Sequence, residues 1–199
     1  MLAGGLSRRM GGREKALITL DGRTLLEHAI DRLAPQVGPL LLNANGDPAR
    51  FARFGLPVRA DVIEGFGGPL VGLLTGMEWA AEVGAEWVVT VPADTPLFPR
   101  DLVERLAAAG SGGVSMATSG GQLHPVFGLW PVRLHDALRH ALADGERKVQ
   151  TFAERYGLAR VDWPAQPADP FFNANTPGEL EQLPSLARRL ADGDHTAGP

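Results

Sequence analysis

The chain of 199 residues is predicted to fold as one α/β domain, in which a mostly parallel central sheet lies between two layers of helices. Three observations favour this fold class. Short apolar runs, typical of strands buried on both faces, alternate with helical patterns over residues 1–109. Those runs end in polar residues or glycine turns, and the length fits a single domain. We therefore expect helices on both faces of the sheet and a ligand crevice at the strand ends.

The first part of the chain predicts three strands and four helices. Thr24 and Glu27 have the spacing of a capping box, and the apolar residues that follow Thr24 share one helical face up to Leu33. The glycine-rich turn at 65–69 precedes another helical pattern. The expected strands are Pro39–Ala44, Leu56–Ala60 and Glu86–Val91, and the expected helices are Leu25–Leu33, Pro48–Phe54, Leu70–Glu82 and Pro99–Ala109.

The pattern changes after Gly110, where two strand-like runs surround Ser119–Gln122 and predict a hairpin. Residues 1–109 are expected to bind a nucleotide and residues 110–190 a second substrate, with 191–199 as a disordered tail. The elements expected in this second part are strands Val114–Thr118, Leu123–Trp130 and Arg160–Trp163, helices Leu134–Leu142 and Val149–Tyr156, an extended piece Phe171–Asn175, and a closing helix from Gly178 to about Leu190.

The segment Leu2–Lys15, LAGGLSRRMGGREK, contains four glycines, three arginines and one lysine. Glycine lets a ligand approach the main chain, and successive N–H groups with nearby cations form a site for phosphate. The alternative is a flexible basic terminus without function. Lysine occurs only at Lys15 and Lys148, so a lysine at the end of this loop is not background usage. The P-loop pattern and the dinucleotide fingerprint GxGxxG are both absent.

Polar residues follow the predicted strands, namely Asn43, Asp61 and Asp94. The carboxyl ends of parallel strands meet at one edge of a sheet, where ligands bind. A carboxylate at Asp94 suits Mg²⁺, which is commonly shared with substrate phosphates. Simpler interpretations are a helix cap at Asp94 and turn residues at Asp61 and Asn43. His124 has no partner at metal-ligand spacing, so we expect a packed loop histidine.

The run LAGG–SRRMGG–K, followed in order by GGPL, PADTPLFP, GERK and NANTP, resembles Rossmann-like nucleotidyltransferases. It is most similar to the molybdenum cofactor guanylyltransferases. The resemblance extends from Leu2 to about Leu183, and it implies a Rossmann-like three-layer sandwich of the nucleotidyltransferase type. It also implies transfer of GMP from GTP to Mo-molybdopterin, with release of pyrophosphate. LAGG resembles the guanylyl enzymes, whereas the cytidylyl enzymes resemble LAAG, so GTP is favoured over CTP.

The resemblance also implies roles for individual residues. Lys15 and Arg9 would balance charge on the triphosphate, and Asp94 would hold Mg²⁺ as the catalytic metal ligand. Nucleotide-binding positions would be Leu2, Ala3, Gly4, Lys15, Asn43, Asp61 and Asp94, and molybdopterin-binding positions Arg147, Lys148, Asn173 and Asn175.

Composition limits the other classes of function. A net charge of −4 gives no electrostatic case for nucleic acid, and no apolar run approaches the length of a membrane span. The absence of cysteine excludes disulfides and permits a cytoplasmic location. We expect a monomer, with apo-molybdoenzymes or their chaperones as further partners. Alternative functions are a molybdopterin cytidylyltransferase, a sugar-phosphate nucleotidyltransferase, or a GTP-binding cofactor chaperone without catalysis.

Only Met1 precedes LAGG, whereas family members carry a short apolar strand there. Losing about four buried apolar side chains removes ~6–12 kcal/mol. That is comparable to the ~5–15 kcal/mol that stabilises a whole domain. We therefore expect the true start to lie upstream of Met1. Intact-mass measurement of the native protein tests this expectation, and a mass equal to that of the 199-residue chain would contradict it.

Overall fold

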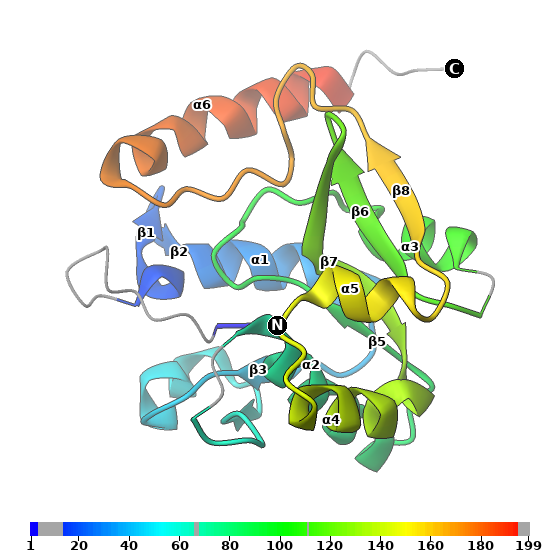
Figure 1. The fold of residues 1–199 in the computed structure, drawn as a ribbon. Coiled ribbons are helices and arrows are strands. Elements are labelled where there is room, and N and C mark those ends of the chain that lie inside the picture. The colour runs from blue at the N-terminus through cyan, green and yellow to red at the C-terminus, as the bar shows by residue number, and fades with distance from the viewer. Residues whose placement is uncertain (4–13, 66–67, 111, 195–199) are drawn as a thin grey trace.

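A computed structural model describes residues 1–3, 14–65, 68–110 and 112–194 (Figure 1). The central sheet contains β5 (Trp87–Thr90), β6 (Ser115–Ser119), β7 (Gln122–Pro131) and β8 (Ala159–Trp163) in the order β5-β7-β6-β8. β7 runs antiparallel to both of its neighbours, and β8 is parallel to β6. β3 (Leu42–Asn43) and β4 (Val58–Arg59) form a parallel pair, and β1 (Thr19–Leu20) and β2 (Arg23–Thr24) an antiparallel one.

Leu2 connects β3 with the segment that follows β5. It forms parallel bridges to Asn43 and Pro92. Its amide donates to the Val91 carbonyl at 2.8 Å, and its carbonyl accepts from the Ala93 amide at 2.9 Å. An apolar cavity of about 260 Å³ lies beside this connection, lined in part by Leu40, Trp79 and Val89. The backbone ladder between the two parts of the sheet therefore passes through residues 1–3.

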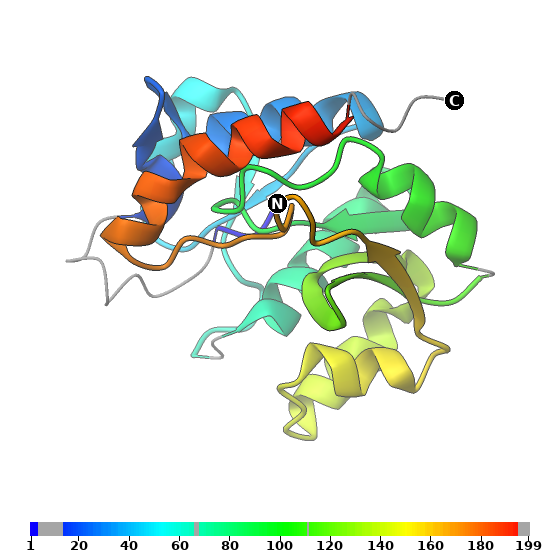
Figure 2. The ribbon, with the colours of Figure 1, turned by 90° about the horizontal axis from the view of Figure 1, so that it is seen from above.

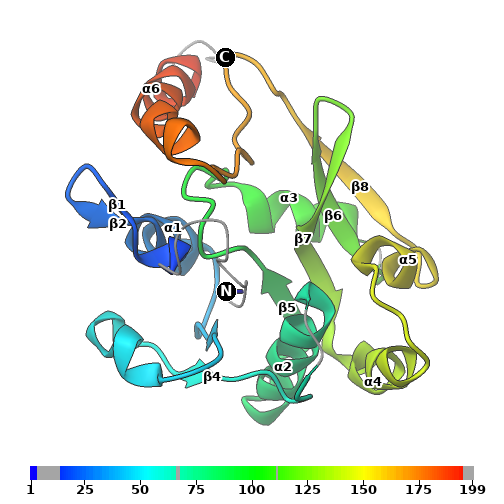
Figure 3. The same ribbon diagram turned by 60° about the vertical axis from the view of Figure 1, so that its left-hand side comes forward.

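Helices cover both faces of the sheet (Figures 2 and 3). The helices are α1 (Leu25–Leu33), α2 (Pro69–Glu82), α3 (Leu102–Ala109), α4 (His135–Ala143), α5 (Val149–Glu154) and α6 (Pro177–Asp194), with 3₁₀ segments at Lys15–Leu17, Ala34–Gln36, Pro48–Phe54 and Val132–Leu134. One buried apolar cluster joins α1 and α3 to the sheet, and a second joins α2, α4 and α5 to its other face. This is the expected three-layer α/β arrangement, and its sheet is mixed.

α6 packs outside this sandwich, against α1 (Figure 1). Leu183 of α6 and Leu25 of α1 are both fully buried in a small cluster that also contains Leu97 and Ala174. The packing of α6 matters for the site because the segment that leads into this helix approaches the ends of the central strands.

None of the helices described is long and apolar enough to cross a bilayer.

Most predicted elements are present, with shifted ends. The capping box of α1 is confirmed, since Thr24 accepts from the Glu27 amide and the Glu27 carboxylate accepts from the Thr24 amide. Pro48–Phe54 is a 3₁₀ helix, α3 begins three residues after Pro99, and α5 ends at Glu154. The closing helix continues to Asp194, so residues 191–194 of the predicted tail are helical, and residues 195–199 lie outside the described residues.

Candidate active site

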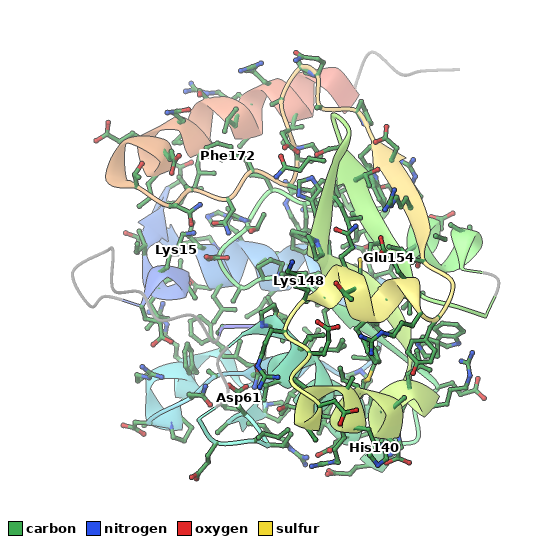
Figure 4. All side chains as sticks on the ribbon, viewed as in Figure 1. Lys15, Asp61, His140, Lys148, Glu154 and Phe172 are labelled. Atoms are coloured by element: carbon green, nitrogen blue, oxygen red, sulfur yellow. The ribbon has the colours of Figure 1, made fainter. Side chains whose placement is uncertain are left out.

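The predicted strand-end residues meet where Leu2 joins the two parts of the sheet. The Ala3 amide donates to the Asn43 carbonyl at 2.9 Å, and Asp94 follows the Ala93 amide that bonds to Leu2. Residues 4–13, which include the predicted site residues Gly4 and Arg9, lie outside the described residues. Figure 4 labels Lys15 in the 3₁₀ segment Lys15–Leu17, Asp61 after β4 and Lys148 before α5.

Lys15 lies at the centre of a cluster of oxygen atoms. Its Nζ is 2.8 Å from Asp94 Oδ2 and donates to Asn175 Oδ1 at 2.9 Å. It also donates to Asn173 Oδ1. The Lys15 side chain is 11% exposed and that of Asp94 is 25% exposed. An ammonium has three donors, and all three have acceptors here. The structure therefore brings Lys15 and Asp94 into direct contact, and their predicted proximity is confirmed.

Asn175 is held in place by the start of α6, and its Nδ2 donates to the Asn173 carbonyl at 3.0 Å. The Glu179 carboxylate accepts from the amides of Asn175 at 2.7 Å and Thr176 at 2.9 Å, and the Glu179 amide donates to Thr176 Oγ1 at 3.3 Å. The backbone bond from Asn175 is the main reason that the pKa of Glu179 lies below its usual value. The two asparagines, predicted to bind molybdopterin, thus lie beside Asp94. That Glu179 holds this segment was not predicted, although the T-x-x-E spacing from Thr176 to Glu179 is typical of a capping box.

A second polar cluster forms around Asp61. Asn43 Nδ2 donates to Asp61 Oδ1 at 2.9 Å, and Asn45 Nδ2 donates to Asp61 Oδ2 at 2.7 Å. Asn45 Oδ1 accepts from the Asp61 amide at 2.8 Å. Asn43 and Asp61 therefore lie together at the strand ends, as predicted. Asn45 was not predicted as a site residue, although it follows Asn43 by two positions in the sequence NAN.

Gly72 of α2 allows this helix to approach Asn43 closely. A Cβ at Gly72 would lie 2.4 Å from Asn43 Oδ1 and 3.0 Å from Leu2 Cδ2. Asn43 is 3% exposed and holds Asp61, so the side chain has little freedom to move away. Only glycine fits at position 72 without displacing the Asn43–Asp61 pair.

Replacing Gly72 with alanine is therefore expected to destabilise the fold by ~1–3 kcal/mol, as overpacking does, and to weaken nucleotide binding. Gly76→Ala in the same helix is the matched control, because its Cβ would meet Val88 Cγ2 at 3.8 Å, an ordinary contact. That variant should be neutral or up to ~1 kcal/mol more stable, since alanine favours helix. Urea unfolding and nucleotide titration measure both effects. Equal stability of the two variants would contradict the packing argument.

Arg147 and Lys148 lie in the loop before α5, which Glu146 organises. The Glu146 carboxylate accepts from both following amides, at 2.8 Å and 2.9 Å, and pairs with Arg155 at 2.7 Å. These backbone bonds lower the pKa of Glu146. Arg147 donates to the carbonyls of Leu142 and Glu146, and Lys148 is exposed. These contacts of the loop are local ones, with Leu142, Glu146 and Arg155.

His124 is packed, as predicted, but it lies in β7 and not in a loop. It stacks on Phe171 with ring centroids 4.7 Å apart, and its Nε2 lies 2.6 Å from Ser119 Oγ. Ser119 donates to Asp169 Oδ1 at 2.8 Å, and the same oxygen accepts from the Phe171 amide. Burial lowers the pKa of His124, and the charge of Asp169 opposes this only in part. The cluster anchors the segment that carries Asn173.

This lowered pKa gives a pH dependence of stability. The unfolded chain takes up the proton at about pH 6.5, whereas folded His124 resists protonation. Stability is therefore lost as the pH falls below about 6.5 and through the lower folded pKa. His124→Gln removes this component, so its melting temperature should fall less than that of wild type between pH 8 and pH 5. Parallel curves for the two proteins would contradict the assignment.

Solved structures show the class of fold. The chain superposes on a molybdopterin-guanine dinucleotide biosynthesis protein A from Archaeoglobus fulgidus with a TM-score of 0.70 and 22% identity, covering 96% of this chain and 97% of the other. A 2-C-methyl-D-erythritol 4-phosphate cytidylyltransferase from Thermus thermophilus gives a TM-score of 0.65 and 20% identity, with 94% and 96% covered. The fold is thus that of the α/β nucleotidyltransferases.

Sequence relationships narrow this class. The MobA-like NTP transferase domain matches residues 1–161. A molybdenum cofactor guanylyltransferase of Bradyrhizobium sp. (strain ORS 278) is 54% identical over 193 residues, 94% of this chain and 91% of the relative. The one of Mesorhizobium japonicum is 49% identical over 198 residues, with 96% and 95% covered. The chain belongs to the MobA-like NTP transferase family, and it is a nucleotidyltransferase.

Proposed function

We propose that this protein transfers GMP from GTP to Mo-molybdopterin in a Mg²⁺-dependent reaction, forming molybdopterin guanine dinucleotide and pyrophosphate. The observation that carries the proposal is the 2.8 Å contact between Lys15 and Asp94 at the strand ends. It joins the end of the glycine loop to a carboxylate beside the Asn43–Asp61 cluster. The names of the relatives at 49% and 54% identity support the choice of both substrates.

The reaction requires little acid–base chemistry from the protein. A phosphate oxygen of molybdopterin attacks the α-phosphorus of GTP in line, and the bond from that phosphorus to the β-phosphate bridging oxygen breaks. The nucleophile is already an anion, so no general base has to remove a proton. Catalysis is then a matter of orientation and of stabilising charge on the phosphates. We assign this task to Lys15, to the N–H groups of the glycine loop, and to Arg9.

Lys15 can perform this task by exchanging its partners. In the structure its ammonium donates to three oxygens, those of Asp94, Asn173 and Asn175. A triphosphate offers anionic oxygens, which form stronger charge-assisted hydrogen bonds than amide oxygens do. We therefore expect Lys15 to leave the two asparagines when GTP binds, so that their side chains become available to the second substrate.

The residues around Asp94 fit Mg²⁺. This ion prefers oxygen ligands, keeps several waters, and is bound through one or two carboxylates together with substrate phosphates. Asp94 supplies such a carboxylate, which is partly exposed beside Lys15. Within the described ranges, no three His, Cys, Asp or Glu side chains form a closed metal cage. When bound, Mg²⁺ would neutralise triphosphate charge, and Asp94 would hold it beside Lys15.

Asp61 is suited to reading guanine. Its two carboxylate oxygens have about four acceptor sites, and Asn43 and Asn45 use one on each oxygen. The remaining sites can accept from the N1–H and 2-amino groups of guanine, which occur together in no other common base. We place Leu2, Ala3 and Gly4 against the nucleotide by their backbone.

On the side of the second substrate, we assign Arg147 and Lys148 to the terminal phosphate of molybdopterin, with Asn173 and Asn175 beside the reacting groups. The backbone bonds of Glu146 fix the loop from which both cations extend. Apo-molybdoenzymes or their chaperones are proposed to take up the product. A cytoplasmic monomer is the state that we propose for the enzyme.

A pyrophosphate-release assay with Mo-molybdopterin and each nucleoside triphosphate in turn tests the proposal. We expect release with GTP and Mg²⁺, and little with CTP, ATP or UTP. Turnover with CTP would indicate a cytidylyltransferase, and use of a sugar 1-phosphate as acceptor a sugar-phosphate enzyme. GTP binding without pyrophosphate release would support a cofactor chaperone.

A further inference from the structure

Asn45 does more than contact Asp61 at one atom. It donates to the carboxylate through Nδ2 and accepts from the Asp61 amide through Oδ1, so one side chain holds both the backbone and the side chain of Asp61. Asn43 holds the second carboxylate oxygen. With both oxygens held, the carboxylate has one orientation at the strand ends, which is what a base-reading group requires.

Arg50 in turn holds Asn45 and connects it to Glu14, the residue before Lys15. Its Nη2 donates to the Asn45 carbonyl at 2.5 Å, and its Nη1 lies 2.7 Å from Glu14 Oε2. Glu14 directly precedes Lys15, whose ammonium contacts Asp94. One guanidinium therefore links the turn that orients Asp61 with the residue before Lys15.

The turn around Arg50 is shaped for this contact. Gly46 has a φ of +85°, and a Cβ there would lie 3.3 Å from Arg50 Nη2. Arg50 Nε also donates to the Asp47 carbonyl at 3.0 Å, and Asp47 caps the Pro48–Phe54 helix through the Ala49 amide. Glu14 is partly buried and this burial raises its pKa, which the charge of Arg50 opposes. A partly buried carboxylate favours a fixed cation beside it.

We propose that Asn45 and Arg50 are positioning residues for base selection. Asn45 fixes the orientation of the Asp61 carboxylate toward guanine, and Arg50 fixes the position of this carboxylate relative to Lys15. The proposal rests on the proposed guanylyl transfer. Asp61 in the correct orientation distinguishes GTP from ITP, which lacks the 2-amino group. Loss of either positioning residue lets the carboxylate rotate, so the extra hydrogen bond to GTP weakens while the triphosphate contacts remain.

The test compares kcat and KM for GTP and for ITP in the full-length protein with Mo-molybdopterin. For Asn45→Ala we expect the preference for GTP over ITP to fall on the order of tenfold, as for weakening one hydrogen bond to a charged group. KM for GTP should rise while kcat changes little. Arg50→Ala should reduce the same preference and also kcat, since Glu14 beside Lys15 loses its partner. Arg50→Lys keeps the charge near Glu14 and should resemble Asn45→Ala.

Arg53→Ala is the matched control. Arg53 lies in the same 3₁₀ helix, but its guanidinium covers Phe54 at 4.8 Å and approaches Glu27 at 3.8 Å. It should keep the wild-type preference, and thermal melting of all variants shows whether a change follows lost stability alone. A wild-type preference in both Asn45→Ala and Arg50→Ala overturns the inference.

Asp61→Asn separates the inference from the proposed function. If this variant loses the preference and the Asn45 and Arg50 variants keep it, Asp61 reads the base but the positioning network is wrong. If Asp61→Asn also keeps the preference, both the inference and the assignment of Asp61 are wrong. Pyrophosphate release with GTP in the wild type still reports on guanylyl transfer itself.

Discussion

Replacing Lys15 with alanine is expected to lower kcat for pyrophosphate release by roughly 10²–10³-fold, as for the loss of one preorganised donor to a developing charge. The ammonium is already held beside Asp94 at 2.8 Å, so it needs little reorganisation to reach the triphosphate. In the variant, Asp94 also keeps its negative charge without the paired cation. Saturating GTP and Mo-molybdopterin in the assay separate this effect from weaker binding.

Two further variants define what the Lys15 result means. Lys15→Arg keeps the charge but not the compact ammonium that fits between three oxygens, so partial activity is expected. Arg23→Ala removes an exposed cation whose partner is Asp31, and its turnover should equal that of wild type. A Lys15→Ala enzyme with near-wild-type kcat would remove the central element of the proposed site.

The part of this site that the sequence predicts is the part set by local or regular geometry. Parallel strands end at one edge of a sheet, so Asn43, Asp61 and Asp94 could be placed together without knowledge of the packing. The capping box at Thr24 was equally accessible, because it depends on residues three positions apart. Patterns of this kind need no information about distant segments.

Contacts between distant segments are the part that the sequence does not reveal. Asn173 was expected near molybdopterin, which stays a prediction, but nothing in the sequence indicated that its oxygen accepts from Lys15, 158 positions away. That contact depends on the packing of α6 against α1, which brings the Phe171–Asn175 segment close to Lys15. No periodicity in either segment encodes the pairing.

Asn45 and Arg50 were overlooked for a different reason. Asn45 stands in a sequence of turn-forming residues, where an asparagine is common without a binding role. Arg50 is one of many arginines in a chain that contains only two lysines, so an arginine at this position does not by itself indicate a role. Only the distances to Asp61, Asn45 and Glu14 show that each side chain has a defined place.

Replacing Asp94 with asparagine is the second large effect that we expect. A metal ion that stabilises transition-state charge contributes several kcal/mol, and each ~1.4 kcal/mol is a factor of ten, so kcat should fall by roughly 10²–10³-fold. The neutral amide is a weaker ligand for Mg²⁺ than the carboxylate. The half-saturating Mg²⁺ concentration should therefore rise, and high Mg²⁺ should recover part of the activity.

The dependence on Mg²⁺ separates a metal ligand from a residue that only pairs with Lys15. An asparagine at position 94 can still accept from the Lys15 ammonium through its amide oxygen. The free energy of unfolding should therefore fall by no more than ~3 kcal/mol, the upper value for a hydrogen bond to a charged group. Asp61→Asn is the control, because it should alter base preference without moving the Mg²⁺ midpoint. An unchanged midpoint in Asp94→Asn would place the metal elsewhere, and the Lys15–Asp94 contact would then be a structural ion pair.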